Sequence, residues 1–284
     1  MALTINLYDI FWFFMIYAFL GWCAEVAFVA VNTGELVNRG FLNGPVCPIY
    51  GAGMVLVLLF TAPLAKNLFL LFLGGMAVAS ALEFATGWAL KKLFHTSWWD
   101  YSDKPFNLGG YICLSFSILW GLGVVAVVRL LHPMIAGLVA AVPHRLGLAL
   151  AAPCSLVFLA DTAVTVRTIV GLNRSLGELD RVAEALHKGS DAMALRLGSA
   201  ALAADEELDE GKEKLSAALS EGRQKLAGGR AELEARRDLL RGQVLDTRLF
   251  GAARLLRAFP AMKHVQHKER LEELQQRLRA RLGR

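Results

Sequence analysis

The sequence is poor in charge for its length. Charged residues make up 19% of the 284 residues, against about a quarter in ordinary soluble domains, whereas hydrophobic residues make up 55%. Residues 1–170 hold 8 Lys or Arg and 7 Asp or Glu, and the shorter remainder holds 22 and 18. This division excludes a single soluble enzyme with one core and also a disordered chain. It predicts a transmembrane domain over residues 1–170 and a charged, water-facing tail over residues 171–284.

Signals of several other classes of protein are missing. No Lys or Arg precedes Arg39, so the first apolar run lacks the basic start of a secretory signal and is interpreted as an uncleaved span. The four cysteines have no CxxC spacing and predict neither a disulfide framework nor a zinc site. The chain has no GxxxxGK[ST], GxSxG or HExxH motif. We therefore expect no cofactor, no metal, no nucleic-acid partner and no ATPase site in this chain, and an enzyme is not the favoured interpretation.

Five apolar runs approach the length of about 20 residues that a membrane-spanning helix needs. They cover residues 7–31, 47–65, 67–90, 108–130 and 146–170. Between Pro133 and Pro143 a stretch too short to cross is re-entrant, interfacial or a kinked extension of the fourth span. Lys and Arg are more frequent in the connections on the side of the tail. This distribution favours a multi-pass protein of the inner (plasma) membrane with a cytoplasmic tail and an outside N-terminus.

Three acidic residues fall inside the first, third and fifth spans: Glu25, Glu83 and Asp161. Each lies in the C-terminal half of its span, and these spans run in the same direction, so the acids lie at similar depth. An acid at mid-membrane costs about 3 kcal/mol on insertion scales. The arrangement predicts a shared polar cavity. The alternative is that the acids only bridge helices, through hydrogen bonds or through Arg129 or Arg39.

Two long loops connect the spans, and their segments 38–51 and 98–113 are rich in Gly, Pro, Asn and aromatic residues. Non-helical backbone at membrane depth is tolerated only where it is buried in protein or lines a cavity, and Gly/Pro-interrupted segments in two halves of a chain are typical of transporter binding sites. We predict a substrate site near the cytoplasmic face, built from the polar side chains of these loops and the three acids. Its residues are Glu25, Asn38, Arg39, Asn43, Glu83, Asp100, Asn107 and Asp161.

Beyond Gly171 the pattern is that of a charged helix. Apolar residues recur at spacings of three and four, as on one helix face: Leu172, Leu176, Leu179, Ala183 and Leu186. A heptad follows at Leu219, Leu226, Leu233 and Leu240, but Gly222 and Gly229 occupy companion positions, which weakens a coiled coil. Acids gather in Asp205–Glu213 and bases in Arg248–Arg284. We predict a long helix or helical hairpin that docks a second copy or a protein partner, with a basic end on anionic lipid or on the acidic block.

Three motifs stand at the mouths of the spans. The first is Gly21-Trp22-Cys23-x-Glu25-Val26, the second is Asn38-Arg39-Gly40-Phe41-Leu42-x-Gly44-Pro45-x-Cys47-Pro48-Ile49-Tyr50-Gly51, and the third is Trp99-Asp100-Tyr101-Ser102 with Asn107 and Gly109. In these motifs the chain resembles the bacterial membrane family of putative type IV ABC-transporter permeases. The resemblance covers about residues 5–170 and implies a permease, but it carries no mechanism to these positions.

The sequence favours an all-α, polytopic helical membrane protein with Gly/Pro-rich, re-entrant loops and a helical or coiled-coil tail. The favoured function is that of a permease, the membrane subunit of an ABC-type transporter, which sits in the lipid bilayer and works with a separate ATPase subunit. One alternative is a membrane-anchored scaffold that acts through its tail. Another is an intramembrane lipid-modifying enzyme, in which Arg39 binds a phosphate headgroup and Glu25 or Asp100 acts as a base.

Overall fold

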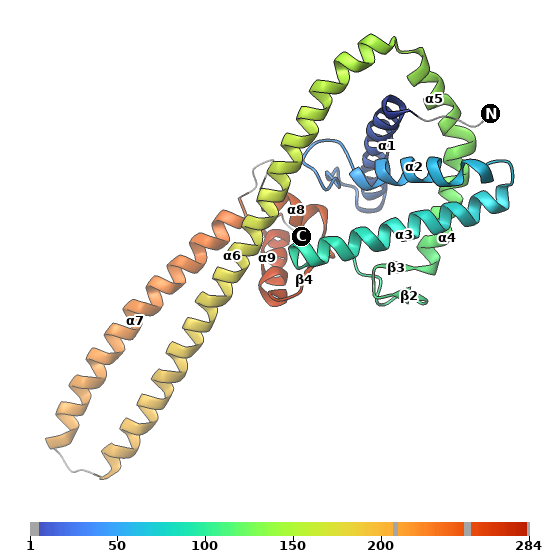
Figure 1. The fold of residues 1–284 in the computed structure, drawn as a ribbon. Coiled ribbons are helices and arrows are strands. Elements are labelled where there is room, and N and C mark those ends of the chain that lie inside the picture. Colours follow the sequence, from blue (N-terminus) through green and yellow to red (C-terminus); the bar gives the residue numbers. More distant parts are fainter. Residues whose placement is uncertain (1–5, 207–209, 247–250, 283–284) are drawn as a thin grey trace. The chain divides into compact units, whose positions relative to one another are not determined.

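A computed structural model of the chain describes residues 6–206, 210–246 and 251–282 (Figure 1). The chain forms two compact units, Met1–Val170 with Thr247–Lys268, and Gly171–Asp246 with Glu269–Arg284. Helices dominate both units, and the strands that the structure describes are two residues long and form two antiparallel pairs. The predicted all-α, polytopic helical fold is confirmed.

Four helical runs of the described chain are long and apolar enough to cross a membrane: Leu7–Thr33, Leu68–Phe94, Leu114–Ala141 and His144–Gly189. The predicted span 47–65 is instead a shorter apolar helix, α2 (Pro48–Thr61), followed by the 3₁₀ turn η1 (Ala62–Leu64). The 14 residues of α2 rise about 21 Å, less than the hydrocarbon thickness of about 30 Å. Four of the five predicted spans are therefore long enough to cross a membrane by themselves, and the second is a shorter apolar helix.

The fourth predicted span continues through the proline-bounded stretch for which the sequence left three interpretations open. Helix α4 (Leu114–Ala126) passes through a π-helical turn, η2 (Val127–Leu131), into α5 (His132–Ala141). Pro133 lacks an N–H group and clashes with the preceding turn of a regular α-helix. The wider π turn lies directly before it, and such single turns are a common way to absorb an irregularity within a helix. The stretch is therefore an extension of the span.

Asparagine side chains start the first and third spans. The Asn6 side chain accepts a hydrogen bond from the Asp9 N–H at the start of α1 (Leu7–Thr33), with 2.9 Å between the atoms. Asn67 accepts from the N–H groups of Phe69 and Leu70 at the start of α3 (Leu68–Phe94). These side chains satisfy N–H groups that have no partner inside the helix. Helix α1 ends at Gly34, whose φ of 74° is strained for other residue types.

In the first unit α2 packs against both α1 and α3, and α3 also packs against α4. One apolar cluster joins α1, α2 and α5 through Phe13, Tyr17, Leu58, Ile135 and Val139. A second joins α2, α3 and α4 through Val57, Leu71 and Val124. Gly75 permits the close approach of α3 and α4, because a Cβ atom there would lie 2.4 Å from a methyl group of Val124. Small residues at helix contacts are the usual means of close packing in membranes.

The short strands shape the loops after α3. Strands β2 (Asn107–Leu108) and β3 (Ile112–Cys113) form a hairpin whose turn holds Gly109 and Gly110 at φ values of 62° and 73°. Two consecutive positive φ values are those of a type I′ turn, for which glycine is favoured. Strand β1 (Thr96–Ser97), just after α3, pairs with β4 (Lys263–His264) near the other end of the chain.

Residues 251–267 form a segment that we call the C-terminal clasp, and it lies in the first unit. It contains α8 (Ala252–Ala258) and β4. Its buried apolar residues are Ala253, Leu255, Leu256, Ala258 and Met262. The sequence assigned everything after Gly171 to the tail. The clasp differs from that expectation, because its apolar side chains contact the membrane half of the chain and its strand β4 pairs with β1 there.

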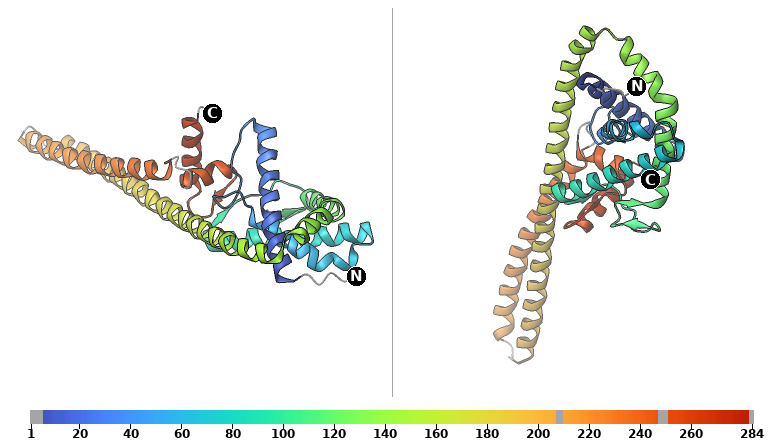
Figure 2. Two further views of the ribbon diagram at one scale, coloured as in Figure 1. Left: turned by 90° about the horizontal axis from the view of Figure 1, so that it is seen from above. Right: turned by 45° about the vertical axis from the view of Figure 1, so that its right-hand side comes forward.

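The second unit contains residues 171–206 of α6 (His144–Glu206), α7 (Glu210–Val244) and most of α9 (Lys268–Arg281). In Figures 1 and 2, α7 runs antiparallel to this part of α6. Leucines of the predicted helix face are buried here, with residues of α7 and α9: Leu172, Leu176, Leu179, Leu240, Val244, Leu271, Leu274 and Leu278. The side chains of Leu219, Leu226 and the block Asp205–Glu213 lie outside the described residues, so the coiled coil stays a prediction.

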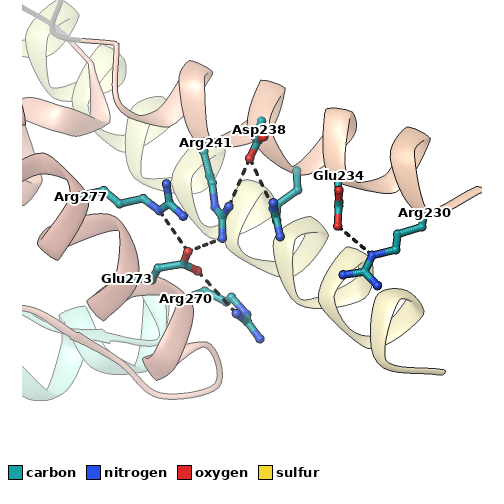
Figure 3. A network of polar contacts seen from close by, with 8 residues as sticks. Arg230, Glu234, Asp238, Arg241, Arg270, Glu273 and Arg277 are labelled. Atoms are coloured by element: carbon teal, nitrogen blue, oxygen red, sulfur yellow. Dashed lines mark hydrogen bonds and ion pairs between the residues drawn. The ribbon is translucent and has the colours of Figure 1, made fainter. Parts of the chain in front are cut away.

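Ion pairs connect α7 to α9 within the second unit (Figure 3). Arg241 contacts Asp238 on its own helix, at 3.2 Å, and Glu273 on α9. Glu273 in turn contacts Arg277 at 3.1 Å and Arg270 at 3.6 Å. One carboxylate therefore holds three guanidinium groups together. Such networks stabilise a helix contact more than single exposed pairs do.

Candidate functional site

A cavity of about 520 Å³ lies in the first unit. It is bordered by residues of α1, α2, α3, α4 and α6, by both long loops and by the C-terminal clasp. Most of the wall is apolar, and eight aromatic residues contribute to it: Phe41, Tyr50, Trp98, Trp99, Tyr101, Trp120, Phe158 and Phe259. Three ionisable residues of the predicted site also line it, Glu25, Arg39 and Glu83. An apolar cavity with a few convergent polar groups is typical of a small-molecule site.

Glu25 is held at the cavity wall by two contacts. The Tyr50 hydroxyl donates to Oε1 of Glu25 at 2.6 Å, and Nε of Arg39 forms an ion pair with Oε2 at 3.5 Å. Gly21, one turn before Glu25 on α1, makes room for the Tyr50 ring, because a Cβ atom at Gly21 would lie 2.3 Å from it. The first and second sequence motifs therefore meet at this contact.

Glu83 is the more deeply buried acid, with 8% of its surface exposed. The Tyr101 hydroxyl donates to Oε1 and the Trp120 indole N–H donates to Oε2, both at 3.2 Å. The Trp120 ring also meets the Tyr50 ring edge to face, with 5.8 Å between their centroids. A continuous chain of contacts thus runs from Glu25 through Tyr50 and Trp120 to Glu83.

Asp161 instead braces the first long loop. Its Oδ1 accepts hydrogen bonds from the backbone N–H and the side-chain amide of Asn43, at 3.1 and 2.8 Å, and its Oδ2 accepts from the Gly44 N–H at 2.7 Å. The Asn43 amide also reaches the Thr165 hydroxyl at 3.0 Å. Asp161 therefore differs from Glu25 and Glu83, which line the cavity. Depth in the membrane did not reveal this difference, because the helix face on which Asp161 lies turns it to the loop.

Asn38 stabilises the same loop from its other end. Its Oδ1 accepts from the Trp22 indole N–H at 2.7 Å and from the Gly40 N–H at 2.9 Å, and its Nδ2 donates to the Asn43 carbonyl at 2.7 Å. Asn38 and Asn43 therefore fix the backbone on either side of Arg39 and Phe41. These contacts give the conspicuous asparagines of the second motif a positioning role.

The second loop is braced in a similar way. Oδ1 of Asp100 accepts from the N–H and the hydroxyl of Ser102, at 2.9 and 2.5 Å, and its Oδ2 forms an ion pair with Lys263 at 2.7 Å. The hydrogen bonds from Lys263 and Ser102 lower the pKa of Asp100 to about 2. Asn107 donates to the carbonyls of Lys104 and Ser102 and accepts from the Gly110 N–H.

The clasp supplies site residues that the sequence prediction missed. Phe259 lines the cavity, meets the Trp98 ring edge to face at 4.9 Å, and lies 5.5 Å beneath the Arg39 guanidinium. Arg39 also donates to the Ala258 carbonyl. Arg254 donates to the carbonyls of Gly40 and Phe41, at 2.8 and 3.0 Å. The clasp therefore closes one side of the cavity.

A weak signal for the clasp exists in the sequence. Residues 255–262 form a mainly apolar stretch, interrupted by Arg257, within the otherwise highly charged half of the chain. Such a stretch does not follow the periodicity of the neighbouring charged helices, which indicates a different packing partner.

Among the described residues, no three His, Cys, Asp or Glu side chains are grouped as a metal site would require.

The family model described as putative ABC-transporter type IV matches residues 12–166, more than half of the chain. Every cavity-lining residue except Phe259 lies within this range. No curated protein and no solved structure matches the chain. The matched region, its helices and its loops agree with the resemblance seen in the three motifs. The chain is therefore a helical membrane protein that belongs to the family described as putative ABC-transporter type IV.

Proposed function

We propose that the chain is the membrane subunit of an ABC-type transporter and that its cavity holds the transported substrate. The observation that carries the proposal is the placement of Glu25, Arg39 and Glu83 in the wall of one mainly apolar cavity. Ionisable side chains within membrane-spanning segments are costly and usually mark a substrate or ion pathway. A protein that only anchored a tail would have no need for them at a cavity.

The eight predicted site residues divide into two roles under this proposal. Glu25, Arg39 and Glu83 contact the substrate, because they line the cavity. The other five hold the two loops that form its rim, because their polar atoms are engaged by loop backbone and side chains: Asn38, Asn43, Asp100, Asn107 and Asp161. Hydrogen bonds that hold the residues around a binding site keep the site in its productive geometry.

A separate subunit supplies ATP hydrolysis in this proposal, because the chain has no phosphate-binding loop of the GxxxxGK[ST] type. The excess of Lys and Arg on the side of the tail favours the inner membrane with the tail in the cytoplasm, where ATP is available. The long helical pair of the second unit is then the surface for a partner protein or a second copy.

Purification of the tagged full-length chain from its native membrane tests the proposal. An ATPase subunit with a GxxxxGK[ST] motif should co-purify with the wild type and equally with Glu83→Gln, which changes the cavity and not the partner surface. Transport should be lost in Glu83→Gln and kept in Asp103→Asn, a matched loss of one negative charge at an exposed position. Recovery of proteins that bind the second unit, without any ATPase, would instead support the scaffold.

A further inference from the structure

We infer that the ligand of the cavity is a monovalent organic cation whose apolar or aromatic body fills the space between the rings. The inference rests on the proposed function, because it takes the cavity as the substrate site. It names the chemical class of the substrate from the charges, the hydrogen bonds and the walls of the cavity.

The ionisable side chains that line the cavity do not balance in charge. Glu25 and Arg39 form an ion pair with 3.5 Å between Oε2 and Nε, so their charges offset each other. Glu83 has no such partner, since the described part of the chain brings no Lys, Arg or His into an ion pair with it. Both of its oxygens accept from neutral donors, Tyr101 and Trp120. The cavity therefore carries one uncompensated acidic group, which a single positive charge would balance.

Both carboxyl oxygens of Glu83 face hydrogen-bond donors. An indole N–H can only donate, and the Tyr101 hydroxyl donates to the other oxygen. Donors at both oxygens are the surroundings that an ionised, acceptor-only carboxylate requires. Each oxygen retains a further lone pair, which a cationic N–H or a quaternary centre placed in the cavity would meet.

The cavity wall is poorly suited to an anionic ligand. Arg39 is the one basic side chain in the cavity wall that the structure describes, and its guanidinium is already engaged. It pairs with Glu25, donates to the Ala258 carbonyl and lies over the Phe259 ring at 5.5 Å. An anionic ligand would have to displace these contacts and also approach Glu83. The charge and the contacts therefore oppose an anion.

The walls favour an organic cation over a bare metal ion. Trp99, Trp120, Tyr50 and Tyr101 line the cavity, and aromatic rings attract cations through their negative faces, an arrangement that recognises quaternary ammonium groups. The volume of about 520 Å³ lies in the range of about 300–1,000 Å³ that sites for drug-sized ligands occupy. It exceeds what a single dehydrated ion needs.

A matched pair of probes tests the inference, namely tetraphenylphosphonium and tetraphenylborate, which share size and shape and differ in the sign of the charge. Triphenylphosphine oxide serves as a neutral third probe. Binding is measured on the full-length chain in lipid nanodiscs, with empty nanodiscs subtracted. Occupancy of the cavity is read from protection of Cys47, a cavity-lining residue, against prolonged alkylation in site-resolved mass spectrometry. The reaction is run at alkaline pH, because the thiolate is the reactive form.

The wild type should bind tetraphenylphosphonium at least tenfold more tightly than tetraphenylborate and should protect Cys47. Glu83→Gln should lose this preference, Glu83→Asp should keep it because the charge remains, and Asp103→Asn should behave as the wild type. The comparison of probes on the wild type needs no variant, so a folding defect in Glu83→Gln leaves the test intact.

Other outcomes overturn the inference in distinguishable ways. If the borate or the neutral probe protects Cys47 at least as well as the phosphonium, the cavity is a ligand site as proposed but the cation class is wrong. If none of the probes protects Cys47, the cation class is rejected and the proposed substrate site loses its support as well. Binding of the phosphonium without any co-purifying ATPase would retain the cation site and reject the transporter.

Discussion

Asp161 offers a sharp test of the division between residues that line the cavity and residues that brace its loops. Replacement by Ala removes the acceptor for the N–H groups of Asn43 and Gly44 and for the Asn43 amide. A buried donor left without a partner costs about 1–3 kcal/mol. The two backbone donors are partly buried, so together they predict a loss near the lower end of this range, about 2 kcal/mol in the free energy of unfolding.

A conservative variant at the same position gives a graded comparison. Asp161→Asn keeps one carbonyl acceptor but presents an amide to the remaining donor, so its loss should be smaller than that of Asp161→Ala. For domains of 150–250 residues, 1 kcal/mol shifts Tm by about 2–4 °C. Asp161→Ala should therefore lower Tm by at least about 4 °C, with Asp161→Asn between it and the wild type.

The assay is thermal unfolding of the purified chain in one detergent, with Asp103→Asn as the control for the loss of an exposed negative charge. Protection of Cys47 by tetraphenylphosphonium is measured on the same samples. The expected decrease in Tm for Asp161→Ala is about 4 °C or more. If this variant instead unfolds within about 2 °C of the wild type and still loses ligand protection, the reasoning is refuted. Asp161 would then be a substrate contact and not a loop brace.

Three further predictions concern the rim of the cavity. Burial, reinforced by the negative charge of Glu25, raises the pKa of Cys47 to about 12. The alkylation rate of Cys47 should therefore rise about tenfold per pH unit from about pH 7 to 10, because the thiolate is the reactive form, and a plateau near about pH 9 would contradict this. Lys263→Ala should raise the pKa of Asp100 from about 2. Because the folded pKa of Asp100 lies below the unfolded one, the Lys263–Asp100 pair stabilises above about pH 4, and the effect fades as the pH falls through about 2. The free energy of unfolding at pH 7 should therefore fall by about 0.2–1 kcal/mol in Lys263→Ala, as for other exposed pairs. An unchanged stability at pH 7 would contradict a role of this pair in holding the clasp. Phe259→Ala should speed alkylation of Cys47 severalfold at constant pH, and an unchanged rate would show that the clasp does not cover the cavity.

The sequence predicted the helical membrane fold and the family, and both are confirmed. The fold was predictable because each spanning helix must satisfy its own backbone in a long apolar run. The second run was the exception. Pro48 and Pro63 bound a helix that is shorter than the apolar run which contains it, and hydropathy measures the run and not the helix.

The candidate site was predictable in part. Glu25 and Glu83 were recognisable as costly acids in apolar helices, but their depth could not specify which helix face each occupies, and Asp161 turns to the loop. The clasp was harder to foresee. Arg254 contacts Gly40 across a separation of 214 residues, and a contact of that kind leaves no local periodicity in the sequence.

The most direct test of the account is the flux of labelled tetraphenylphosphonium across native membrane vesicles in which the membrane potential has been collapsed. The account predicts an ATP-dependent flux with the wild type and with Asp103→Asn, and none with Glu83→Gln present in the membrane at equal amount. An equal flux in Glu83→Gln and the wild type would contradict the claim that Glu83 and its cavity form the transport site.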